Sequence, residues 1–114
     1  MKEEAFVATL FRYIKNKNMD SIEVYKKANI DRRLFSKIRN NPNYIPSKKT
    51  AVSLAIALEL TLEETKDLIG RAGFVLSKTI IFDSIIEHFI SVGNYNISEI
   101  NEILFEHKQP LLGE

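Results

Sequence analysis

The chain has 114 residues, of which 45% are hydrophobic and 27% charged, and its formal net charge is +1. This length and composition fit one soluble globular domain that buries its own core. The absence of cysteine excludes a disulfide framework and a thiolate metal site. No signal peptide is evident, and no apolar run approaches the roughly 20 residues that span a bilayer. We therefore expect a cytoplasmic protein without a membrane partner.

Charge is distributed unevenly along the chain. Residues 1–49 contain 12 Lys/Arg and 5 Asp/Glu, a net charge of +7, whereas residues 50–114 contain 4 and 10, a net charge of −6. Such asymmetry favours one face that attracts polyanions and another that faces solvent or a protein. Chance clustering of charge on solvated helix faces is the alternative.

The first two helices are indicated by helical spacing and by capping residues. The first is predicted over about residues 3–17 from apolar side chains at i, i+4, i+7 and i+8: Phe6, Leu10, Tyr13 and Ile14. Asp20, followed three residues later by Glu23, predicts the start of a second helix over 21–28. Asn29 is expected to end it in a left-handed turn.

The third helix, residues 31–40, carries the functional prediction. We expect Asp31 to cap it and Asn41-Pro42 to stop it. One stripe of this helix is polar or basic: Arg32, Arg33, Ser36, Lys37 and Asn40. Its apolar residues point away from that stripe: Leu34, Phe35 and Ile38. A short basic helix with an apolar back is what insertion into the major groove of DNA requires.

Two further helices are predicted from residue 47 to residue 72. Ser47 begins one of them, with a narrow apolar stripe at Ala51, Leu54, Ala55 and Leu58. Thr61 and Glu64 form a capping box that begins the next, which runs to about Ala72 before Gly73.

The remaining chain predicts two more helices. Ser77 is expected to start one that runs to about residue 92, and Ser98 to cap a short last helix. The first has a wide apolar face: Ile81, Phe82, Ile85, Ile86, Phe89 and Ile90. That face can belong to the core or form a dimer seam. No strand is convincing, so the predicted fold class is all-α.

The pattern of residues 4–73 resembles the phage-repressor-like (Cro-like, or XRE) helix-turn-helix family. The likeness is carried by the turn residue Asn29, by Pro46-Ser47 and by five apolar positions: Val24, Ala28, Ile30, Phe35 and Ile38. It implies a five-helix DNA-binding core over residues 1–73, with residues 74–114 as a helical extension. The whole-chain pattern is also similar to small helical domains appended to larger bacterial proteins in stress-related contexts, which implies an adaptor.

The resemblance implies roles for individual residues. Arg32, Arg33, Ser36 and Lys37 would face base edges and nearby phosphates, and Ser21 would contact the DNA backbone. Basic Arg39 and polar Asn40 are further candidate DNA-binding residues at the end of the same helix. Lys48 and Lys49 stand in the first turn of a helix, where positive charge opposes the helix dipole, so a phosphate partner is plausible. Simple surface lysines are the alternative.

An enzyme is not expected. The sequence has no glycine-rich phosphate loop and no cysteine nucleophile, and His88 and His107 lack the neighbours of a metal or catalytic site. No cofactor or metal is predicted. We expect a transcription regulator of bacterial or phage type that binds double-stranded DNA. A homodimer through residues 78–92 would place two recognition helices about 34 Å apart on a palindromic operator. The alternative is a protein-interaction module that keeps the fold without sequence-specific DNA binding.

Overall fold

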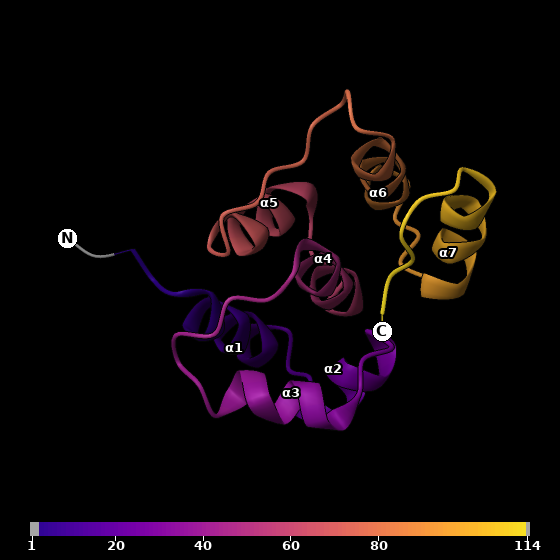
Figure 1. The fold of residues 1–114 in the computed structure, drawn as a ribbon. Coiled ribbons are helices and arrows are strands. Elements are labelled where there is room, and N and C mark those ends of the chain that lie inside the picture. Colours follow the sequence, from indigo (N-terminus) through magenta and orange to yellow (C-terminus); the bar gives the residue numbers. More distant parts are fainter. Residues whose placement is uncertain (1–2, 114) are drawn as a thin grey trace.

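The computed structural model describes residues 3–113, and this part of the chain forms seven α-helices and no strand (Figure 1). The helices are α1 Phe6–Asn16, α2 Ser21–Lys27, α3 Arg32–Arg39, α4 Lys48–Ala57, α5 Leu62–Gly70, α6 Ile81–Ser91 and α7 Ile97–Glu106. The all-α prediction is confirmed. Within residues 3–113, none of the helices is both long enough and apolar enough to cross a membrane.

Helix α4 lies at the centre of the molecule (Figure 1). All of its residues from Thr50 to Ala57 are buried, and it packs against α2, α5 and α7. Small side chains such as Ala51 and Ala55 allow these neighbours to approach closely. Further contacts link α1 to α5, α2 to α3, α5 to α6, and α6 to α7. Residues 74–113 therefore pack directly on the elements that precede them.

Local capping signals fix several helix starts as predicted. The carboxylate of Asp20 accepts a hydrogen bond from the N–H of Glu23 at 2.8 Å, and Ser47 Oγ accepts one from the N–H of Thr50 at 3.2 Å. Thr61 and Glu64 form both hydrogen bonds of a capping box. These three caps are confirmed.

Three predicted helix starts are wrong. Helix α1 begins at Phe6 and not at about residue 3. Helix α6 begins at Ile81 and not at Ser77, because the N–H of Ser77 donates instead to the carboxylate of Asp83 at 2.8 Å. Helix α7 begins at Ile97, one residue before the predicted cap Ser98. Its cap is Asn96, whose side-chain oxygen accepts from the N–H of Glu99 at 3.1 Å.

The C-terminal tail is anchored to three parts of the fold. The side-chain amide of Asn101 on α7 accepts from the N–H of Leu112 at 2.8 Å and donates to its carbonyl at 3.1 Å. The N–H of Gly113 donates to Ser53 Oγ on α4 at 2.8 Å. Gly113 also lies against Asn29, since a Cβ added to it would come 2.6 Å from the carbonyl oxygen of Asn29. The tail thus joins α7, α4 and the turn between α2 and α3.

Candidate nucleic-acid interface

Helix α3 lies at the edge of the molecule beside α2, on the opposite side of α4 from α6 (Figure 1). Phe35 and Ile38 are buried beneath it. The polar positions predicted to face outward are all exposed: Arg32, Arg33, Ser36, Lys37 and Asn40. The helix therefore presents a basic outer face above an apolar back.

The turn between α2 and α3 positions this face. Asn29 has a positive φ of 55°, as predicted, and asparagine adopts this left-handed conformation more readily than most side chains. The N–H of Ile30 then bonds to the carbonyl of Tyr25 at 3.1 Å, and the Ile30 side chain is buried. Asp31 follows at the N-cap position of α3, although its carboxylate makes no capping hydrogen bond.

Two of the predicted site residues, Arg39 and Ser21, contact each other. Arg39 Nη2 donates to Ser21 Oγ across the α2–α3 pair. The guanidinium carbon of Arg39 lies 5.6 Å from the centre of the Phe11 ring and 5.5 Å from that of Phe35. This distance permits cation–π attraction. Arg39 is consequently held against α1 and α2.

A small hollow of about 200 Å³ separates α2 from α3 on this face. Its lining combines polar and apolar side chains: Ser21, Ile22, Tyr25, Arg32, Phe35, Ser36 and Arg39. Ile22 is exposed, and the half-buried Tyr25 ring lies 5.7 Å from the Phe35 ring. Ile22 was not among the predicted site residues.

The predicted phosphate-contacting lysines have different surroundings. Lys48 Nζ lies 2.8 Å from both carboxylate oxygens of Asp83, of which Oδ2 accepts a hydrogen bond and Oδ1 makes an ion-pair contact only. Lys49 is half-buried in the first turn of α4. The pairing brings Lys48 toward α6 and offsets its charge.

Acidic side chains also flank α3. Glu23 and Asp31 are both exposed, and Glu23 lies 3.8 Å from Lys27 in an ion pair along α2. Exposed pairs of this kind contribute little to stability. They do lower the positive charge near α3.

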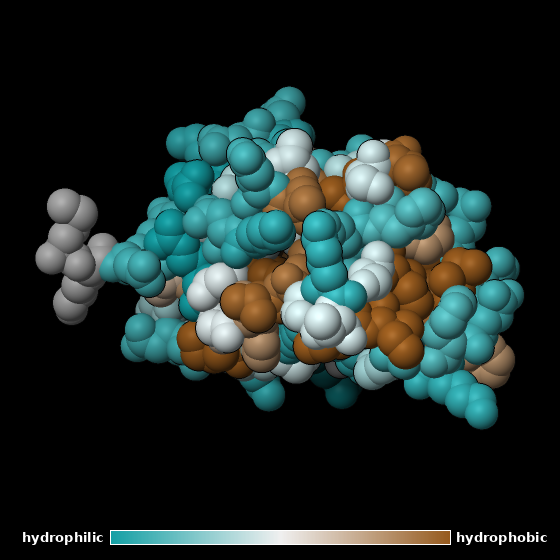
Figure 2. Space-filling model, turned by 90° about the horizontal axis from the view of Figure 1, so that it is seen from above, coloured by the Kyte–Doolittle hydropathy of each residue, from teal (hydrophilic) through white to brown (hydrophobic). Residues whose placement is uncertain are grey.

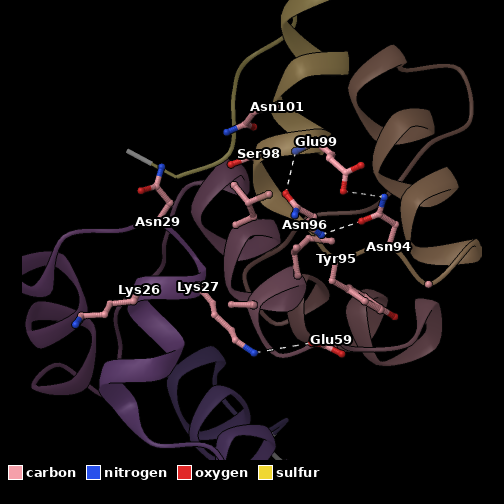
Figure 3. Close-up of a pocket in the computed structure, with 14 residues that line it drawn as sticks. Lys26, Lys27, Asn29, Glu59, Asn94, Tyr95, Asn96, Ser98, Glu99 and Asn101 are labelled. Carbon is pink, nitrogen blue, oxygen red and sulfur yellow. Dashed lines mark hydrogen bonds and ion pairs between the residues drawn. The ribbon is translucent and has the colours of Figure 1, made fainter.

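A larger cleft lies on another face, between the ends of α2 and α4 and the start of α7 (Figure 3). It has a volume of about 730 Å³ and is lined by Lys26, Lys27, Asn29, Ile56, Ala57, Glu59, Gly93, Asn94, Tyr95, Asn96, Ile97, Ser98, Glu99 and Asn101. Its polar groups mostly bind one another. The N–H of Asn96 donates to Asn94 at 3.0 Å, and Lys27 lies 3.9 Å from Glu59. The cleft lies beside the capped start of α7, and none of the predicted DNA-binding residues lines it.

Several ionisable groups with a shifted pKa lie on α1 and α5, among them Tyr13 and Asp67. Burial, together with a 2.8 Å hydrogen bond to Asp67, raises the pKa of Tyr13. Burial acts to raise the pKa of Asp67, but hydrogen bonds from Tyr13 and Arg71 lower it overall. Within residues 3–113, no group of three or more His, Asp or Glu side chains is placed to hold a metal ion.

The chain was compared with models of protein families, with curated proteins and with solved structures, and none of the three comparisons gives a match.

Proposed function

We propose that this chain is a non-catalytic DNA-binding protein, a transcription regulator that inserts α3 into the major groove. In this proposal, α1 to α5 form a repressor-like helix-turn-helix core, and α6 and α7 form an extension. The observation that carries the proposal is the outer face of α3, where Arg32, Arg33, Ser36 and Lys37 are exposed above buried Phe35 and Ile38.

The exposed groups suit distinct tasks in a groove. Arg32 and Arg33, at the start of α3, can each donate two hydrogen bonds to O6 and N7 of guanine. Ser36 and Lys37 lie one turn further along and can reach bases or phosphates. Lys49 can contact a phosphate, whereas Lys48 has less charge to offer because Asp83 neutralises it.

Charge supports the same face. The net charge of +7 over residues 1–49, which include all of α3, favours a polyanion as partner. Ser21 and Arg39 hold each other, so we assign them to bracing α2 against α3, with Ser21 also near the DNA backbone.

The test is a set of three single alanine variants measured by fluorescence anisotropy on a duplex selected from a random pool. Arg33→Ala should weaken binding to the selected duplex by about 1–3 kcal/mol and leave mixed-sequence binding nearly unchanged. Lys49→Ala should weaken both duplexes alike. Lys66→Ala, which removes the same charge from an exposed site on α5, is the matched control.

Two results would oppose direct readout. If Arg33→Ala and Lys49→Ala each lose the same binding free energy on every duplex, α3 binds DNA only through non-specific electrostatic attraction. A loss with Lys66→Ala as large as that with Arg33→Ala would show that net charge, and not α3, governs binding.

A protein-interaction module is the second candidate. Exposed Ile22 beside Tyr25, with Glu23 and Asp31 nearby, gives the α2–α3 face an apolar and partly acidic character. Phe105 on α7 is also 74% exposed. If the wild-type chain does not bind DNA at all, this candidate takes precedence; binding whose salt dependence counts several neutralised phosphates would oppose it.

A further inference from the structure

The C-terminal tail packs against the turn between α2 and α3, which places the candidate DNA-binding helix. A Cβ added to Gly113 would lie 2.6 Å from the backbone carbonyl oxygen of Asn29 and 2.8 Å from its side-chain nitrogen. Gly113 also has a φ of +88°, which glycine adopts at no steric cost. Both the space and the backbone conformation at this contact therefore suit glycine and no larger residue.

Two anchors hold the tail in this position. On α7, the side-chain amide of Asn101 pairs with both main-chain groups of Leu112, at 2.8 and 3.1 Å. On α4, the N–H of Gly113 donates to Ser53 Oγ at 2.8 Å, and this hydroxyl donates to the carbonyl of Lys49 at 2.8 Å. Ser53 and Leu112 are buried, so a polar group that loses its partner there is left without water.

Asn29 is the residue at which the chain turns from α2 to α3. Its φ is 55°, and the N–H of the next residue, Ile30, closes the turn by a bond to the carbonyl of Tyr25 at 3.1 Å. Helix α3 begins only three residues after Asn29, at Arg32. A tail that packs on Asn29 therefore supports the turn that sets where α3 begins.

The tail provides a path from α7 to this turn. Helix α6 lies across α4 from α3 (Figure 1), and the face seen from above, where apolar side chains gather between polar ones (Figure 2), is turned away from α3. The tail descends from α7 and ends beside α2 (Figure 1). Asn101 and Asn29, at the two ends of this connection, line the same cleft of about 730 Å³ (Figure 3).

We propose that Asn101, on α7, is a positioning residue for α3. It holds the tail on Asn29, and the tail in turn holds the α2–α3 turn closed. This coupling between α7 and the turn depends on the fold alone. Its consequence for DNA, that α7 controls how Arg32 and Arg33 meet the bases, rests on the proposed function.

The test is amide hydrogen exchange of the whole chain, followed by NMR without DNA. Asn101→Ala should raise the exchange rate of the Ile30 N–H by more than about tenfold, since two hydrogen bonds that hold the tail are lost and the turn opens locally. The N–H of Phe74, which closes α5 by an equivalent bond to the carbonyl of Ile69 at 3.0 Å, is the internal reference and should stay unchanged. Glu102→Ala, at the neighbouring exposed position of α7, should change neither rate.

Ser53→Ala provides a second variant, because it removes the anchor on α4 and leaves Asn101 in place. It should also raise the rate of Ile30 relative to that of Phe74. If neither variant raises the rate of Ile30, the proposal is wrong. Equal rises at Ile30 and Phe74 would overturn it as well, because they would indicate a general loss of stability and not an opening of the turn.

A separate measurement tests the consequence for DNA. Asn101→Ala should weaken binding to the selected duplex more than binding to a mixed-sequence duplex, since base contacts depend on where α3 lies and phosphate contacts carry no sequence information. Equal losses on the two duplexes would contradict a role in positioning α3. If the wild-type chain binds no duplex, the proposed function fails alone, and the exchange rates still decide whether Asn101 controls the turn.

Discussion

The ammonium group of Lys48, in the first turn of α4, lies 2.8 Å from each carboxylate oxygen of Asp83, which is fully buried on α6. Asp83 also accepts the N–H of Ser77. One carboxylate thus fixes both the start of α6 and its attachment to α4. A buried carboxylate that loses its cationic partner is costly, because the one backbone N–H that remains offsets only part of the lost solvation.

Lys48→Ala should therefore lower the free energy of unfolding by about 3 kcal/mol, since it strands the carboxylate of Asp83. Lys49→Ala, one residue away and half-buried, should change it by less than about 0.5 kcal/mol. Urea denaturation of both variants measures the difference. Similar values for the two would mean that the Lys48–Asp83 pair contributes nothing specific to stability.

A second prediction concerns the anchored tail and compares two glycines with nearly the same backbone conformation, Gly73 and Gly113. Gly73 and Gly113 have φ angles of +87° and +88°, so alanine is strained at both by about 1–2 kcal/mol. A Cβ at Gly73 meets nothing within 4 Å, whereas at Gly113 it would come 2.6 Å from the carbonyl of Asn29. Gly113→Ala should therefore destabilise the protein more than Gly73→Ala does, and equal thermal shifts would contradict the tail contact.

A third prediction concerns acid. The pKa of Glu64 is lowered chiefly by its hydrogen bond to the backbone of Thr61, and that of Asp67 is lowered, against the effect of burial, by Tyr13 and Arg71. A carboxylate whose folded pKa is depressed contributes stability above its unfolded pKa, near 4, and loses it as pH falls through the folded value.

The free energy of unfolding should therefore fall as the pH is lowered from about 4 to 2. Asp67→Asn should make this loss smaller, because the asparagine side chain does not titrate. Urea titrations of both proteins across this range measure the slopes. Identical slopes would exclude Asp67 as a contributor.

Local signals in the sequence predicted much of the fold. The caps at Asp20, Ser47 and Thr61 and the left-handed turn at Asn29 depend on neighbouring residues, and all were identified correctly. The same signal is present for α7, since Asn96 precedes Glu99 by three residues, although the predicted cap is Ser98.

Contacts between distant residues could not be read from the sequence in this way. The start of α6 depends on Asp83 and Lys48, which are 35 residues apart. The tail depends on Ser53, 60 residues before Gly113. Ile81 was assigned to the apolar face of its helix but is exposed, because periodicity indicates an apolar stripe without indicating what covers it.

Contacts between distant residues also determine the candidate DNA-binding face, and the sequence does not indicate them. The exposed stripe of Arg32, Arg33, Ser36 and Lys37 follows from helical spacing alone. The contacts of Arg39 with Ser21 and with two aromatic rings do not follow from helical spacing, since one of the rings, Phe11, belongs to α1. Basic composition therefore identified the face, but only tertiary packing distinguishes the arginines that extend outward from the one that is held.

Binding of the wild-type chain to a mixed-sequence duplex, measured by fluorescence anisotropy across a salt series, tests the central claim most directly. The account predicts that the logarithm of the association constant falls linearly with the logarithm of salt concentration. The slope should be about −0.9 for each neutralised phosphate, with several phosphates counted. Absence of binding even at low salt would contradict the proposal that α3 is a DNA-binding helix.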